Sequence, residues 1–238
     1  MPTYTVNFSA AFAATLFAIA ACSPNGSTPR ADASPGTAAA ATISQSPTPA
    51  APDPIVAAAD HGRIQGDTSA KTWVIIASDF QCPYCKQWHS ETYEAFLKEY
   101  VRSGKVKVAY VNYPLGQHQN AIITAQAAMC ASAQNKFWQY HDALFNSQGV
   151  WETMPQPRPV LDSLAKTVGV DMPSWGKCVD SGKMLPLIQA DRDRLSQAGV
   201  QSTPTFLIGD ELLAGAQPIS AMRPALDSAI RKNSAAGH

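Results

Sequence analysis

Two cysteines separated by two residues directly follow a short, continuous apolar segment. The segment runs from Thr72 to Phe80 and contains Trp-Val-Ile-Ile-Ala, a run rich in β-branched residues that is typical of a strand buried on both faces. Cys82 and Cys85 come next, and Pro83 is a favoured residue at the first position of a helix. The sequence therefore predicts a strand leading into a helix, with a dithiol at the junction.

This position gives the dithiol a defined chemistry. The dipole and the free backbone amides of a helix N-terminus stabilise a cysteine there as a thiolate, the form that attacks disulfides. We expect Cys82 to be exposed and to act as the nucleophile, and Cys85, one turn further in, to be more buried and to resolve the mixed disulfide. Tyr84 is expected to be exposed, where it either contacts substrates or only shapes the turn.

Two other uses of such a cysteine pair are a zinc site and a plain stabilising disulfide. A structural zinc site has four ligands, so this pair would need two more, typically from a second Cys pair or from closely spaced histidines. The histidines here are scattered along the sequence, at His61, His89, His118, His141 and His238. We therefore expect no metal and no cofactor.

The rest of the folded region alternates strand and helix patterns. Residues 105–111 alternate polar and apolar side chains as a strand does, and residues from about 119 to 197 have the apolar spacing of helices. The strand pattern resumes at 205–208 and returns through 211–214, before a helix from about Ile219 to Lys232. The expected fold is α/β, with an inserted helical subdomain at about residues 115–198.

The first sixty residues have a different composition. Residues 8–21 are almost wholly apolar but too few to span a bilayer, which predicts a signal peptide over residues 1–21, although the first ten contain no Lys or Arg. The segment ending in Cys22, Ile-Ala-Ala-Cys, looks like the lipobox of bacterial lipoproteins. Cys22 is the expected lipidation site; an ordinary cleaved signal and a buried structural cysteine are the alternatives. Residues 22–59, rich in Ala, Pro, Ser and Thr, predict a disordered lipid-anchored linker before a domain over residues 60–238.

The five cysteines divide evenly under these assignments. Once Cys22, Cys82 and Cys85 are assigned, Cys130 and Cys178 remain, both in the helical region. Exported proteins commonly pair such cysteines. A bridge between these two would close a loop of nearly fifty residues; two unpaired core cysteines are the alternative.

The charge of the chain is balanced. Lys and Arg total 18, and so do Asp and Glu. A balanced chain has no broad electrostatic footprint for nucleic acid or for an anionic membrane surface. Binding to nucleic acid is therefore not expected.

Three segments in order resemble the DsbA-like thioredoxin-domain family, especially its branch near the Gram-positive oxidases. They are Ser78–Cys85 (SDFQCPYC), Lys136–Phe145 (KFWQYHDALF) and Gly199–Phe206 (GVQSTPTF). The resemblance covers residues from about 60 to 232 and implies a thioredoxin fold with an inserted helical domain.

The resemblance also implies roles for particular residues. Cys82 would be the nucleophile and Cys85 the resolving thiol, with Pro83 and Tyr84 between them. Pro204, after Thr203, would be the cis-proline facing the active disulfide. Cys130 and Cys178 would form the second bridge that some relatives contain.

The leading functional hypothesis is an oxidase that introduces disulfides into exported proteins. A membrane partner, DsbB-like or similar, would reoxidise it, and the enzyme would be a monomer in the periplasm or cell envelope, tethered through Cys22. A reductase or isomerase is the enzymatic alternative. From another class, a redox-inert binding or chaperone module is also open.

One position departs from the family pattern. Many thioredoxin-fold enzymes carry a buried acid six residues before the nucleophile, where this chain has Ile76. Asp79, three residues before Cys82, is expected to be a solvated or hydrogen-bonded loop residue more than a substitute base. The proton route to Cys85 is therefore open.

Overall fold

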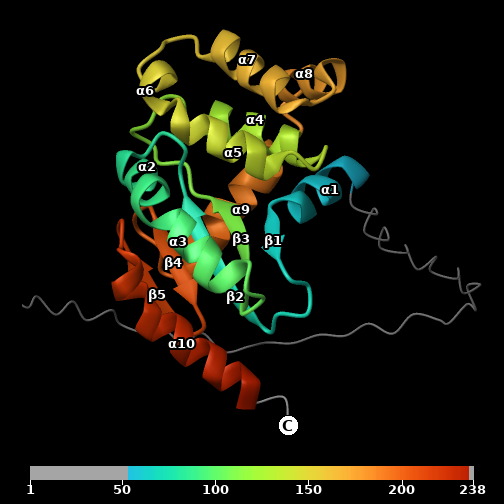
Figure 1. Cartoon of the computed structure of the whole chain (residues 1–238). Helices are drawn as coiled ribbons and strands as arrows, with labels where there is room; N and C mark the ends of the chain where they lie inside the picture. The colour runs from blue at the N-terminus through green and yellow to red at the C-terminus, as the bar shows by residue number, and fades with distance from the viewer. Residues whose placement is uncertain (1–52, 236–238) are drawn as a thin grey trace, which may run out of the picture. The chain divides into compact units, whose positions relative to one another are not determined.

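A computed structural model describes residues 53–235. The predicted signal peptide, Cys22 and linker residues 22–52 lie outside the described residues. The described part is built on one five-stranded sheet with the order β1-β3-β2-β4-β5 (Figure 1). Its strands are β1 (Ile64–Gly66), β2 (Thr72–Ser78), β3 (Val106–Asn112), β4 (Thr205–Ile208) and β5 (Glu211–Ala214).

The sheet is mixed. β2 is parallel to β3 and antiparallel to β4, while β1 and β5 pair antiparallel at the two edges. The helices are α1 (Pro54–Gly62), α2 (Pro83–Trp88), α3 (Glu94–Phe96), α4 (Ala121–Ser132), α5 (Phe137–Asn146), α6 (Gln148–Trp151), α7 (Arg158–Val168), α8 (Met172–Asp180), α9 (Leu185–Gln197) and α10 (Ile219–Ala235). The predicted α/β fold with inserted helices is confirmed.

The helix after the dithiol is less regular than its pattern predicts. Two π-helical turns, η1 (His89–Tyr93) and η2 (Leu97–Val101), join α2 and α3 into one helical segment from Pro83 to Val101. A π-helical turn holds one more residue between hydrogen-bonded groups than an α-helical turn does, and such turns are frequent at functional sites. Among residues 53–235, no helix is both long and apolar enough to cross a membrane.

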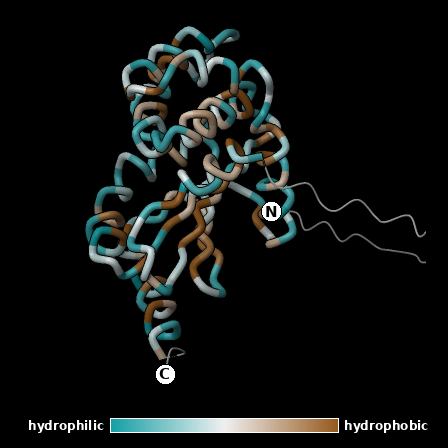
Figure 2. Tube along the Cα trace, turned by 90° about the vertical axis from the view of Figure 1, so that its right-hand side faces the viewer, coloured by the Kyte–Doolittle hydropathy of each residue, from teal (hydrophilic) through white to brown (hydrophobic). Residues whose placement is uncertain are grey.

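Alternate residues of β2 point to opposite faces of the sheet, and each face has its own core. Ile76 belongs to a buried cluster with Trp88 and with Leu226 of α10, whereas Ala77 belongs to one with Leu195 of α9. In Figure 2 the brown, apolar stretches follow the strands of the sheet. The central strand is thus covered on both faces, as its continuous apolar run predicts.

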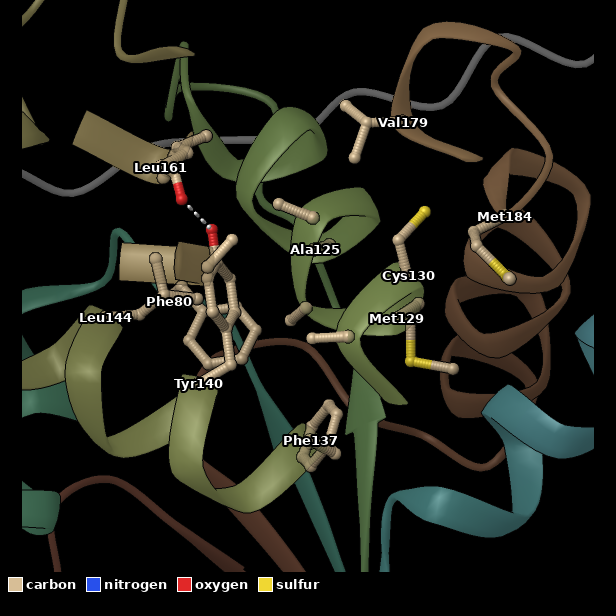
Figure 3. Close-up of a cluster of buried hydrophobic side chains, with 14 of the residues drawn as sticks. Phe80, Ala125, Met129, Cys130, Phe137, Tyr140, Leu144, Leu161, Val179 and Met184 are labelled. Atoms are coloured by element: carbon tan, nitrogen blue, oxygen red, sulfur yellow. Dashed lines mark hydrogen bonds between the residues drawn. The ribbon is translucent and has the colours of Figure 1, made fainter. Parts of the chain in front are cut away.

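The inserted helices have a third and larger core. α4 and α5 lie between the sheet and the pair α7 and α8 (Figure 1). Figure 3 shows Phe80, from the loop after β2, among the side chains of this core, together with Tyr140, whose hydroxyl donates to the Leu161 carbonyl at 3.0 Å. Because Phe80 lies in this core, the loop that leads to the dithiol is packed against the insertion.

The predicted boundary between linker and domain at residue 59 is wrong, because α1 begins at Pro54. Asp53 caps this helix by accepting from the Ile55 amide at 2.8 Å, and proline at its first position fits a helix start. Ala59 is fully buried, and its carbonyl accepts from the Ser132 hydroxyl of α4 at 2.6 Å. An alanine-rich stretch that reads as linker is thus held by packing against α4.

Candidate active site

The dithiol lies where β2 passes into α2. Cys82 is the N-cap of α2, and its backbone is extended, with φ of −69° and ψ of 124°. Its amide donates to the Asp79 carbonyl at 3.1 Å, and its own carbonyl accepts from the Lys86 amide at 3.1 Å. The Cys82 side chain therefore stands at the N-terminus of the helix, where the backbone amides that favour a thiolate are located.

Both sulfurs are free thiols in the structure, and both cysteines are buried. Cys82 is 3% exposed and Cys85 is 2% exposed. The prediction of an exposed Cys82 is therefore wrong. Residues far along the chain cover it, since its Sγ donates to the Thr203 carbonyl at 3.3 Å. Tyr84, by contrast, is 62% exposed.

The structure brings Thr203 and Pro204 to the dithiol from the loop before β4. The peptide bond between these two residues is cis. The fold brings this loop against Cys82, although Thr203 and Cys82 are 121 residues apart in sequence. The segment that the family resemblance singles out thus lies against the nucleophile position.

The two thiols have opposite electrostatic environments. A hydrogen bond from the Cys85 thiol holds the pKa of Cys82 down to about 6 against the opposing effect of burial, with help from the Thr203 side chain and from the backbone amides of Cys85 and Tyr84. Burial raises the pKa of Cys85 well above its usual value, and the neighbouring Cys82 raises it further. When the pair is reduced, one sulfur is therefore ready to ionise near neutral pH while the other keeps its proton.

The inserted helices hold the loop that carries Cys82. The Gln148 side-chain amide, at the start of α6, donates to the Phe80 carbonyl at 2.7 Å and to the Cys82 carbonyl at 3.1 Å. The Gln81 side chain donates to the Glu152 carbonyl at 2.7 Å. Sequence reasoning missed Gln148, since nothing local to it signals a contact with a loop 66 residues away.

Asp79 is a second support of this loop. Its side chain accepts from the Gln81 amide at 2.8 Å and from the Leu115 amide at 2.9 Å, and it pairs with His118 Nδ1 at 2.7 Å. The carboxyl group is fully buried, and burial raises its pKa. Of the two environments expected for Asp79, hydrogen-bonded or solvated, the structure shows the first. His118 went unrecognised as its partner.

Many thioredoxin-fold enzymes carry a buried acid six residues before the nucleophile. In this chain the position is occupied by Ile76, which is apolar and buried. Ile76 is buried in β2, opposite Tyr110 of β3 and Phe206 of β4. It therefore offers no group that could move a proton to Cys85. The fold instead places two ionisable residues, Asp79 and His118, beside the dithiol loop as a hydrogen-bonded pair.

The second cysteine pair lies within the insertion. Cys130 of α4 and Cys178 of α8 are joined by a disulfide, with an S–S distance of 2.00 Å and a Cα–Cα distance of 5.8 Å. Figure 3 shows Cys130 beside the apolar side chains of this core. The bond therefore ties two helices of the insertion together and takes no part in the dithiol loop.

Comparison with known proteins supports this picture. The family model described as Thioredoxin matches residues 58–228. The chain belongs to the thioredoxin family. Its DsbA-like character is seen in its relatives: a probable disulfide bond formation protein D of Bacillus anthracis is 25% identical over 173 residues, which cover 70% of this chain and 77% of the relative.

Solved structures show the same DsbA-like fold. The oxidised form of BdbD from Bacillus subtilis matches with a TM-score of 0.65 and 22% identity, over 72% of this chain and 94% of that one. The α-DsbA1 protein of Wolbachia pipientis matches with a TM-score of 0.66 and 18% identity, over 74% and 94%. The DsbA-like thioredoxin fold expected from the three segments is confirmed.

Proposed function

We propose that this chain, a DsbA-like thiol-disulfide oxidoreductase, works as an oxidase that donates a Cys82–Cys85 disulfide to exported proteins. The observation that carries the proposal is the contrast between the two sulfurs, one favoured as a thiolate and one held as a thiol. A disulfide is oxidising when its reduced form is stabilised. Stabilising the Cys82 thiolate at the helix N-terminus has this effect.

The exchange proceeds in two steps. In the oxidised enzyme a substrate thiolate attacks Cys82 Sγ, a substrate–Cys82 bond forms, and the Cys82–Cys85 bond breaks. The electron pair of that bond leaves with Cys85, which takes up a proton because its buried position favours the thiol. A second substrate thiolate then attacks the substrate sulfur of the mixed disulfide. Cys82 leaves as a thiolate, the substrate is oxidised, and the enzyme holds two more electrons.

The neighbouring residues support the first step. Tyr84 is exposed beside Cys82, and Thr203 contacts the Cys82 sulfur. We assign Pro83, Tyr84, Thr203 and Pro204 to shaping the dithiol site and to contacting an extended substrate peptide.

The partners and the location follow from the same proposal. An oxidase must be reoxidised, and a membrane protein that passes electrons onward is the partner of fitting chemistry. The enzyme would act outside the cytoplasm as a monomer, anchored through lipid on Cys22. Detergent partitioning that is lost in Cys22→Ala tests the anchor, and a wild-type protein found wholly in the soluble envelope fraction contradicts it.

The reduction potential of the Cys82–Cys85 pair tests the direction of the reaction. The expected value lies between those of thioredoxin, about −270 mV, and DsbA, about −120 mV. Equilibration with glutathione buffers, followed by alkylation of free thiols, measures it. A value near −270 mV would replace the oxidase with a reductase, and a pair that resists mild reductant would indicate a redox-inert module.

A further inference from the structure

Two of the histidines that are scattered in sequence meet in the fold. His89 begins the π-helical turn η1, and His141 lies in α5 next to Asp142. His89 Nε2 is 3.1 Å from Asp142 Oδ1, and His141 Nδ1 is 2.8 Å from the same oxygen. One donor atom from each of the three side chains lies within 4.8 Å of the others.

We propose that His89, His141 and Asp142 form a binding site for a divalent late transition-metal ion, for which Zn²⁺ is the reference ligand. Two imidazole nitrogens and one carboxylate oxygen are a donor set that zinc takes in sites with an open fourth position. The role of the ion would be to fasten the helical segment from Pro83 to Val101 to helix α5.

The two distances to the Asp142 carboxylate are close to those that an ion of this size requires. With zinc–ligand distances of about 2.0 to 2.2 Å, the donor atoms of a tetrahedral site lie about 3.3 to 3.5 Å apart. The two distances to Asp142 Oδ1, 3.1 and 2.8 Å, fall a few tenths of an ångström short of this. The Asp142 side chain is 49% exposed and so is free to move by that amount.

The surroundings hold the two histidines in place. His89 stacks on Tyr93 and on Phe145, with ring centroids 5.3 and 5.0 Å away. His141 is buried and meets the ring of Trp138 edge-on at 5.2 Å. Ligands that are already fixed lose little conformational entropy on binding, which favours affinity.

Access to the site comes from one side. The His141 side chain is buried, the His89 side chain is 10% exposed, and the Asp142 side chain is the most open of the three. An ion can therefore enter past Asp142 and keep a water molecule as its fourth ligand. The π-helical turn that starts at His89 is independent support, because such turns are frequent at functional sites.

The test is a zinc titration of the oxidised protein by calorimetry. Cys82 and Cys85 must be in a disulfide, since free thiols would bind zinc themselves. We expect one Zn²⁺ per chain, with binding weakened at least about tenfold in His89→Gln and in Asp142→Asn. His61→Gln, which removes an exposed histidine of α1, is the matched control and should bind as the wild type does.

Two further measurements separate a metal site from a hydrogen-bonded cluster. Co²⁺ bound to the wild type should give the visible absorption of a four-coordinate site, and this should be lost in His89→Gln. Zn²⁺ should raise the melting temperature of the wild type but not that of Asp142→Asn. If no saturable zinc binding is found, or if both variants bind zinc as the wild type does, the three residues form only a structural network and the proposal is wrong.

Discussion

The two cysteine pairs of this chain have the same chemical groups and opposite environments. Cys130 and Cys178 come from two helices of the insertion and are bonded to each other. Cys82 and Cys85 belong to one helix start, where the same arrangement lowers the pKa of the first thiol and raises that of the second. The difference teaches that burial alone does not decide the chemistry of a cysteine pair, since all four cysteines are buried. What distinguishes Cys82 is the hydrogen bond from the Cys85 thiol, helped by the backbone amides of the helix start.

The largest effect should come from removing one sulfur of the reactive pair. Cys85→Ser should trap substrates as mixed disulfides on Cys82, because the resolving thiol is gone, and Cys82→Ser should abolish activity. Non-reducing electrophoresis of envelope extracts measures the trapping. Trapping that persists when Cys82→Ser is added to Cys85→Ser would assign the nucleophile elsewhere.

The pH dependence of the stability of the reduced enzyme should reveal the difference between the reactive pair and the bonded pair. The folded pKa of Cys82, about 6, lies below its ordinary value of 9.0. The Cys82 thiolate therefore stabilises the folded state above about pH 9, and this contribution is lost as the pH falls through about 6. Three pKa units correspond to about 4 kcal/mol.

Denaturant unfolding of the reduced protein between pH 6 and 9 measures this contribution. Cys82→Ser under the same conditions is the control, and the wild type should gain stability relative to it as the pH rises. A constant difference between the two proteins would show that the helix start does not favour the thiolate.

The Cys130–Cys178 disulfide should contribute to the stability of the fold and not to its redox chemistry. Replacing both Cys130 and Cys178 with Ala removes a bridge across 48 residues. We expect the free energy of unfolding to fall by roughly 2 to 4 kcal/mol while the reduction potential of Cys82–Cys85 stays the same. Denaturant melts and a glutathione titration of the same variant check both halves. A shifted potential would show that the two pairs are coupled.

The smallest effect concerns Tyr84, one of the two residues between the reactive cysteines. Tyr84→His would place a partly charged group at the helix start and should raise the potential by roughly 20 to 45 mV. Because Tyr84 is 62% exposed, the change removes little packing. Tyr84→Phe is the control, and equal potentials for the two variants would argue against a charge effect.

Local patterns predicted much of this fold. The strands expected at 205–208 and 211–214 have those bounds in the structure, because β-branched and apolar runs separated by Gly-Asp define a hairpin within ten residues. The dithiol at the helix start was predictable from an equally local pattern, an apolar β-branched run followed directly by Cys-Pro-Tyr-Cys. α1 and β1 were missed, since a short alanine-rich helix and a three-residue strand carry weak signals.

Contacts over long sequence separations were not predictable. The pairing of His118 with Asp79, 39 residues earlier, and the meeting of His89 with Asp142, 53 residues later, depend on how the insertion folds back over the helix start. The burial of Cys82 has the same origin, because Thr203 and Gln148 approach it from distant parts of the chain. A single sequence shows the types of these residues but not their proximity.

The contact of Gln148 with the dithiol loop makes access to Cys82 a question of local stability. α6 is a single turn, held by the buried Trp151, whose indole donates to the Leu144 carbonyl at 3.1 Å. Short elements of this kind open more readily than the whole fold does. When α6 opens, the Phe80 and Cys82 carbonyls lose the Gln148 donor, and one of the supports of the loop is removed. Hydrogen exchange of the α6 amides and alkylation of the Cys82 thiol would then report one shared opening equilibrium, and the insertion would act as a gate that sets how often the sulfur meets a substrate.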